Sequence, residues 1–233
     1  MNYACRKTGK TKAPEAINWI TKFHHYSTHD LYAIYRNPFR KYVKSHAVEK
    51  QEELFLVDGG ETEQNCPIWP FLQPVRKVDV LIVSDNSADL PPSKGFPNGV
   101  SLVATYNQSL AQGLPKMPSI PSESTIVSQG MNKRATFFGC GENERDKVTI
   151  VYLPNVNHTY PSAANTFKLE YKIEETRGMV DNGIHVALQN HEESWPVCLG
   201  CAIMMKSKTI LPKKCQECFK KHCYQPRKGL VGK

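Results

Sequence analysis

Short apolar runs alternate with amphipathic stretches along the chain. Residues 54–57 (Leu-Phe-Leu-Val) form an apolar run closed by Asp-Gly-Gly, which predicts a buried strand followed by a turn. Residues 78–85 are almost continuously apolar, as expected of a strand covered on both faces. Residues 147–153 are rich in β-branched and aromatic side chains and predict a third strand.

Helical periodicity appears between the second and third of these strands. Residues 101–112 place apolar side chains on one helix face, with Ser101 as the cap and Gly113 as the stop. The prolines that come next exclude regular secondary structure, so residues 113–131 are expected to form an irregular surface loop.

The last third of the sequence is predicted to be helical. Two helices are expected near residues 172–190, separated by Asp181-Asn182-Gly183, because this tripeptide is typical of turns. Two further helices are expected near residues 197–207 and 212–222. Strands that alternate with helices predict an α/β fold.

The composition is that of a folded domain with an uneven charge. Of the 233 residues, 40% are hydrophobic and 22% are charged, which excludes global disorder. Residues 1–50 carry ten Lys or Arg against three acidic residues, residues 51–196 carry eleven against eighteen, and residues 197–233 carry nine against one. A uniformly basic domain would indicate nucleic-acid binding. We interpret the two basic ends as solvated faces first and as contacts with an anionic surface second.

Two features disagree about the compartment of the protein. No stretch approaches the roughly 18–20 apolar residues that span a bilayer, and the N-terminus shows no apolar segment typical of a secretory signal. By contrast, eight cysteines, and glycosylation triplets at Asn107 and Asn157, are typical of an oxidising compartment. The residues alone leave this conflict open.

Five of the cysteines lie close together in the tail, and their spacing taken by itself suggests a zinc site. Two Cys-x2-Cys pairs provide four thiolates, a set that zinc prefers, and the lysines around them would then suit nucleic acid. Zinc knuckles usually contain turn residues, whereas these pairs lie in predicted helices with apolar residues between them. The five are Cys198, Cys201, Cys215, Cys218 and Cys223.

Asp58-Gly59-Gly60 directly follows the first predicted strand. Taken alone it is a turn, because Asp-Gly is a common turn dipeptide. Ligands of α/β sheets gather at the carboxyl ends of strands, however. Glycines after the aspartate would let the chain turn sharply and leave the carboxylate exposed in a cleft.

The segment around Asp58 resembles the aspartate-bearing segment of the fungal lysophospholipase (phospholipase B) family, whose members are related to the catalytic domain of cytosolic phospholipase A2. The resemblance implies an α/β fold that forms the C-terminal part of a layered, patatin-like phospholipase A2-type catalytic domain. It covers most of the chain. The segments that carry it are 37–39, 56–61, 65–82, 85–89, 96–106, 137–140, 152–155 and 195–219.

The same resemblance implies a catalytic role for Asp58. Enzymes of this family use a serine nucleophile and an aspartate without a histidine, and Asp58 stands where that aspartate is expected. The chain has no Gly-x-Ser-x-Gly, and Ser101, after the sole Gly-x-Ser, lies at a predicted helix start. We therefore assign no nucleophile, no metal and no cofactor in this chain, and expect the chain alone to be inactive.

The resemblance also implies partners and a compartment. The expected substrate is a lysophospholipid or phospholipid, with peripheral contact to the membrane surface and no nucleic acid. The expected polypeptide partner is the missing N-terminal half of the catalytic domain. A secreted or cell-surface location is implied, with the tail cysteines paired as disulfides.

The implied organisation places the C-terminal part of the catalytic domain at residues 37–225, with a Cys-rich helical tail at 195–225. A basic segment, 1–36, precedes it and a basic tail, 226–233, follows. Without the N-terminal strands, an exposed apolar sheet edge is expected. Two alternatives remain: an inactive basic module that binds anionic surfaces, and a zinc-binding, Cys-rich nucleic-acid module.

Overall fold

The computed structural model describes the chain as two compact units. The described residues are 33–42, 48–56, 59, 64–89, 95–162, 164, 168–207 and 210–226. One unit comprises Met1–Thr62 and the other Glu63–Lys233. The basic segments expected at residues 1–36 and 226–233 lie almost wholly outside the described residues.

The described part of the first unit is an antiparallel pair of strands, β1 (Ala33–Arg36) and β2 (Glu53–Leu56). Asn37 secures the connection between them. Its side-chain amide donates to the carbonyl oxygens of Val48 and Gln51, at 2.6 and 2.8 Å. The connection is therefore fixed by a side chain that satisfies main-chain acceptors.

β2 confirms a strand in the run at residues 54–57, but the prediction that this strand is buried is wrong. Phe55 and Leu56 are 57% and 47% exposed. A four-residue apolar run favours extended backbone, whereas its burial depends on elements that the run itself does not specify.

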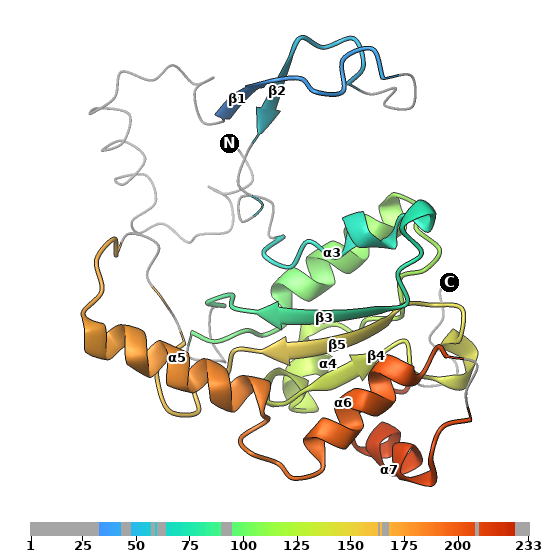
Figure 1. The fold of residues 1–233 in the computed structure, drawn as a ribbon, viewed down its shortest axis with the longest axis vertical. Helices are drawn as coiled ribbons and strands as arrows, with labels where there is room; N and C mark the ends of the chain where they lie inside the picture. The colour runs from blue at the N-terminus through green and yellow to red at the C-terminus, as the bar shows by residue number, and fades with distance from the viewer. Residues whose placement is uncertain are drawn as a thin grey trace. The chain divides into compact units, whose positions relative to one another are not determined.

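The second unit is built on a three-stranded sheet in the order β3-β5-β4 (Figure 1). β3 (Val80–Asp85) and β5 (Thr149–Pro154) are parallel, and β4 (Thr136–Phe138) runs antiparallel to β5. β5 lies in the centre, and all of its residues are buried. The strands predicted at residues 78–85 and 147–153 are confirmed, but the prediction that the first is covered on both faces is wrong, because Ile82 of β3 is 54% exposed.

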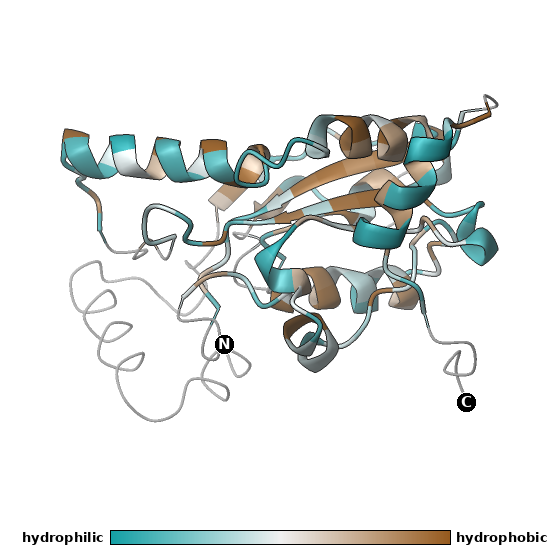
Figure 2. Cartoon of the chain, turned by 90° about the horizontal axis from the view of Figure 1, so that it is seen from below, coloured by the Kyte–Doolittle hydropathy of each residue, from teal (hydrophilic) through white to brown (hydrophobic). Residues whose placement is uncertain are grey.

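Helices cover both faces of this sheet, so the unit is a mixed α/β structure (Figure 2). α3 (Val100–Ala111) and α4 (Glu123–Ser128) lie on one face, and α5 (Ile173–Ala187), α6 (Trp195–Met204) and α7 (Lys213–His222) lie on the other. The core of the first face includes Leu102, Ile126, Phe138, Ile150 and Tyr152. The core of the second face includes Phe137, Val151, Trp195, Cys198 and Ala202.

Short 3-10 helices complete the second unit, and the two tail helices match their prediction. α6 and α7 confirm the helices expected near residues 197–207 and 212–222. The short helices are η2 (Trp69–Leu72), η3 (Pro74–Arg76), η4 (Met131–Lys133) and η5 (Glu142–Glu144).

α3 is capped by a side chain from a different segment, so the prediction that Ser101 is its cap is wrong. The helix begins at Val100. The Asp89 carboxylate accepts the main-chain N–H groups of Asn98 and Val100, at 2.6 and 3.4 Å, and the helix dipole favours a negative charge there. Burial raises the pKa of Asp89. The Ser101 hydroxyl instead accepts the Cys66 N–H at 2.7 Å inside the core.

The prediction that the proline-containing segment 113–131 is an irregular surface loop is wrong, because the segment contains α4 and several buried side chains. Leu114, Met117 and Ile120 are buried, and Ile126 of α4 is fully buried. Prolines exclude long regular elements, whereas burial follows from the apolar side chains between them.

α5 is one continuous helix, so the prediction of two helices separated by Asp181-Asn182-Gly183 is wrong. Asn182 is 2% exposed, and its side chain secures the loop after β5. It accepts the N–H groups of His158 and Thr159, at 2.8 and 3.0 Å, and donates to the Val156 carbonyl at 2.9 Å. These tertiary hydrogen bonds outweigh the local turn preference of the tripeptide.

Candidate active site

Asp58, the predicted catalytic aspartate, lies outside the described residues, as do Val57 and Gly60. β2 ends at Leu56, two positions before it. The structure therefore describes the strand that precedes Asp58 but not the aspartate itself. The assignment of Asp58 as a catalytic residue stays a prediction.

Ser101 is not suited to be the missing nucleophile. Its side chain lies in the first turn of α3 at 2% exposure, and its hydroxyl accepts the Cys66 N–H. Burial raises the pKa of the neighbouring Cys66 thiol, aided by the negative charge of Asp85. A thiol held in its neutral form is a weak nucleophile, so neither group is set up for attack.

The carboxyl end of β3 carries a buried acid that sequence reasoning did not single out. Asp85 is fully buried, and its side chain accepts the Tyr152 hydroxyl at 2.7 Å and the Ser87 N–H at 3.0 Å. Burial and the adjacent negative charge raise the pKa of Tyr152 well above its ordinary value. Both polar groups are satisfied by each other, which indicates a structural link between β3 and β5.

A pocket of about 290 Å³ with a mixed polar and apolar lining opens where β3 and β5 end. Ligands of α/β sheets gather at such strand ends. Among the described residues, its lining offers amide and hydroxyl groups that can bind a polar group, and none of these side chains titrates near neutral pH. The lining residues are Asn86, Asn155, Pro161, Ser162, Ala164, Met179, Asn182 and Gly183.

Both glycosylation candidates are exposed in the second unit. Asn107 lies in the middle of α3, and the hydroxyl of Ser109 in its triplet is buried and donates to the Thr105 carbonyl at 2.7 Å. Asn157 lies in the loop after β5 that Asn182 secures. Modification at either position stays a prediction.

Three disulfides account for the tail cysteines. Cys198 pairs with Cys218 and Cys201 with Cys215, so both bonds join α6 to α7. Cys223 pairs with Cys140, a cysteine that follows β4 and lies outside the tail. Among the described residues, Cys66 has a free thiol.

These disulfides overturn the zinc alternative. Zinc binds thiolates, and each sulfur of the two Cys-x2-Cys pairs is instead bonded to another sulfur. The described residues contain no group of three or more His, Cys, Asp and Glu side chains that could hold a metal ion. The spacing alone suggested zinc because it does not show which face of each helix carries the sulfur atoms.

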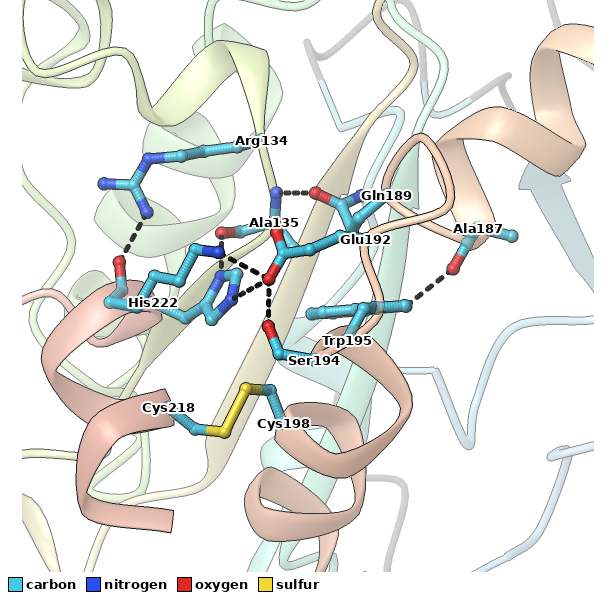
Figure 3. Close-up of polar contacts among 11 residues, drawn as sticks. Arg134, Ala135, Ala187, Gln189, Glu192, Ser194, Trp195, Cys198, Cys218 and His222 are labelled. Carbon is cyan, nitrogen blue, oxygen red and sulfur yellow. Dashed lines mark hydrogen bonds and ion pairs between the residues drawn. A yellow bond between two sulfur atoms is a disulfide. The ribbon is translucent and has the colours of Figure 1, made fainter. Parts of the chain in front are cut away.

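A polar cluster surrounds the buried side chain of His222, where the disulfide-linked helices pack against β4 (Figure 3). The ring Nδ1 of His222 donates to the Ala135 carbonyl at 3.1 Å, and its Nε2 lies 3.9 Å from the carboxylate of Glu192. That carboxylate accepts the Ser194 hydroxyl and the Lys221 ammonium. Burial holds the pKa of His222 below its ordinary value.

The lowered pKa of His222 predicts a stability that falls in acid. The unfolded chain binds more protons than the folded chain below about pH 6.5, the ordinary histidine pKa. The contribution of neutral His222 to the free energy of unfolding is thus complete above that pH. It is lost as the pH falls through the lowered pKa of the folded state. Guanidinium unfolding between pH 7.5 and 5 should show a decline of up to about 1.4 kcal/mol per pH unit.

His222→Gln is the variant that isolates this effect, because glutamine stays neutral over the whole range. The free energy of unfolding of this variant should fall less steeply with decreasing pH than that of the parent chain. His191→Gln, at an exposed position, should show the same dependence on pH as the parent. Equal slopes for the parent and His222→Gln would contradict the assignment.

Comparison with known proteins shows clear similarity to one family. The model of the family described as Lysophospholipase catalytic domain matches residues 5–228. The chain is 41% identical over 206 residues to Lysophospholipase 2 of Aspergillus fumigatus, 37% over 220 residues to Probable lysophospholipase 4 of Schizosaccharomyces pombe, and 36% over 208 residues to Lysophospholipase 3 of Saccharomyces cerevisiae.

These matches cover most of the chain but a smaller part of each relative. They include 82%, 84% and 81% of this chain, against 34%, 32% and 30% of the three relatives in the same order. The chain thus spans about a third of the length of the curated relatives it matches. No solved structure gives a significant match.

In the described part of the chain, no helix is both long and apolar enough to cross a membrane.

Proposed function

The chain belongs to the lysophospholipase catalytic domain family, and we propose that it forms part of an enzyme that hydrolyses the fatty-acyl esters of lysophospholipids with a serine–aspartate dyad. The family match over residues 5–228 supports the reaction class, because the relatives carry the name lysophospholipase. Since the chain spans about a third of those relatives, the complete activity requires polypeptide beyond it.

Asp58 is the residue that we propose as the base of the dyad. The observation that carries this proposal is the segment 56–61, in which Asp58 and two glycines follow an apolar strand inside the matched region. A serine hydroxyl is a poor nucleophile at neutral pH and needs a base within hydrogen-bond reach. The Asp58 carboxylate would orient that hydroxyl and accept its proton as the oxygen attacks the ester carbonyl.

The proposed reaction then proceeds through an acyl-enzyme. The serine oxygen forms an ester with the fatty acid, and the glycerophospho-alcohol leaves with a proton. Water hydrolyses this ester, with Asp58 accepting the proton of the attacking water, and the fatty acid and the free serine hydroxyl are released. No metal or cofactor enters any step.

The serine of the dyad is proposed to lie in polypeptide that this chain does not include. The sequence has no Gly-x-Ser-x-Gly, which is the turn that exposes such a nucleophile. Ser101, the residue after its sole Gly-x-Ser, is buried in the core. The chain by itself is therefore proposed to be inactive.

The substrate and compartment follow from the same proposal. Lysophospholipids gather in membranes and micelles, so the complete enzyme would work at a lipid surface, with which it makes peripheral contact. A secreted or cell-surface location is supported by the three disulfides, because such bonds persist in oxidising compartments.

The test is reconstitution with a lysophosphatidylcholine substrate. This chain would be co-expressed, in an oxidising compartment, with the two thirds of Aspergillus fumigatus Lysophospholipase 2 that the chain does not match. Fatty-acid release is expected from the co-expressed pair and not from either polypeptide alone. Release by this chain alone, or no release by the pair, would contradict the proposal.

A further inference from the structure

Among the described residues, none donates to or accepts from the main chain along the outer edge of β3. The carbonyls of Asp79 and Asp85 accept the N–H groups of Thr149 and Asn155 on the β5 side. Main-chain groups alternate in direction along a strand, so those of Val80, Ile82 and Ser84 point away from β5. In the described part of the chain, no other strand pairs with this edge.

The side chains of β3 are those of an interior strand. Its sequence, Val-Leu-Ile-Val-Ser-Asp, contains no lysine, proline or bulge of the kind that protects natural sheet edges. The side chain of Ile82 is nevertheless 54% exposed. Near-continuous apolar runs are typical of strands in the interior of a sheet that is covered on both faces.

An apolar groove runs beside this edge. It has a volume of about 250 Å³ and lies between residues 65–71 and the β3 residues 81–84. Phe71 contributes to its wall and is 45% exposed. A strand placed along β3 would bury the side chain of Phe71 together with that of Ile82.

The opposite edge of the sheet is closed. Phe137 of β4 forms a parallel bridge with Cys223, and the Tyr224 N–H donates to the Phe137 carbonyl at 2.8 Å. The disulfide between Cys140 and Cys223 fixes the tail segment in this position. The sheet can therefore be extended beyond β3 but not beyond β4.

We propose that β3 is an interior strand of the complete enzyme, and that a strand from the polypeptide outside this chain pairs with the main chain of Val80, Ile82 and Ser84. The inference rests on the proposed function, because its occupant is the rest of the same catalytic domain, which accounts for about two thirds of the relatives. Main-chain pairing supplies affinity, and burial of Ile82 and Phe71 supplies apolar contact.

The test measures co-purification of this chain with the complementary two thirds of Aspergillus fumigatus Lysophospholipase 2, after co-expression. Ile82→Pro removes one outward N–H and leaves the β3–β5 hydrogen bonds intact, since proline is tolerated where the N–H faces away from the sheet. Ile82→Lys places a charge on the same edge. The matched control is Ile203→Lys on α6, where the isoleucine is 50% exposed.

Both Ile82 variants should lower the recovered complex by about tenfold or more, because an incoming main-chain group loses its partner or a charge is buried. Ile203→Lys should recover the parent amount. If Ile82→Pro lowers the melting temperature of the chain alone, its loss of complex could reflect unfolding, and the result with Ile82→Lys then decides whether the β3 edge binds the partner. Failure of the parent chain to co-purify, or equal recovery of the Ile82 variants and the parent, would overturn the inference.

Binding and activity separate this inference from the proposed function. A complex that depends on Ile82 but releases no fatty acid would support β3 pairing and contradict the proposed reaction. An active pair whose yield and rate are unchanged by both Ile82 variants would support the reaction and overturn β3 pairing. Loss of self-association in the Ile82 variants, with complex formation unchanged, would identify a second copy as the occupant and also overturn it.

Discussion

Replacing Asp58 with asparagine should lower the rate of fatty-acid release by the reconstituted pair by about 10²–10⁴-fold. Asparagine has nearly the same shape as aspartate and still accepts a hydrogen bond, but it cannot take the proton of the serine hydroxyl. The loss is therefore expected in kcat, with little change in KM, because the substitution removes an interaction that acts in the transition state.

Asp181→Asn is the matched control, since Asp181 is an exposed carboxylate on α5 that undergoes the same chemical change. This variant should keep the parent rate. The amount of complex recovered with each variant should equal that of the parent, which separates loss of chemistry from loss of assembly. A rate within threefold of the parent for Asp58→Asn would rule out this residue as the base.

Removal of the disulfide between Cys140 and Cys223 should lower the free energy of unfolding by about 2–5 kcal/mol. The bond joins residues 83 positions apart, so its loss releases a long loop in the unfolded chain. It also frees the segment at Tyr224 that closes the β4 edge. Guanidinium unfolding of the double variant Cys140→Ser, Cys223→Ser measures the effect.

The double variant Cys201→Ser, Cys215→Ser provides the comparison. Its cysteines are 14 positions apart, and the remaining bond between Cys198 and Cys218 still joins α6 to α7. The loss of stability should therefore be smaller than for the longer loop. Equal losses, or the reverse order, would show that loop closure does not determine the contribution of these bonds.

The elements with strong local patterns could be predicted from the sequence. β3 and β5 each consist of a near-continuous apolar run, and α3, α6 and α7 have apolar residues at helical spacing. In these segments the local preference and the tertiary environment favour the same structure. The resemblance to the lysophospholipase family, carried by particular segments, is confirmed by the family match.

Features that depend on distant contacts could not be predicted. The cap of α3 comes from Asp89, and the continuity of α5 depends on hydrogen bonds from Asn182 to the loop after β5. The partner of Cys223 is fixed by the position of Cys140 beside β4. Each outcome is decided by a side chain whose partner is remote in sequence, and residue patterns carry no such information.

The candidate site shows the same limit more sharply. The sequence Asp58-Gly59-Gly60 in isolation is typical of a turn, and the catalytic role that we propose for Asp58 depends on a serine that we place outside this chain. Only the resemblance of the surrounding segment indicated catalysis. The β3 edge, with which no described strand pairs, and the absence of a Gly-x-Ser-x-Gly in the sequence both support our proposal that a second polypeptide completes the enzyme.

The central claim is that Asp58 activates a serine located in the complementary polypeptide. Its most direct measurement is the rate at which a fluorophosphonate probe labels that serine, because the probe reacts with an activated hydroxyl. Labelling should be fast when the complementary polypeptide is bound to the parent chain, and about 10²-fold slower or more when it is bound to Asp58→Asn. Equal labelling rates in the two complexes would contradict the claim.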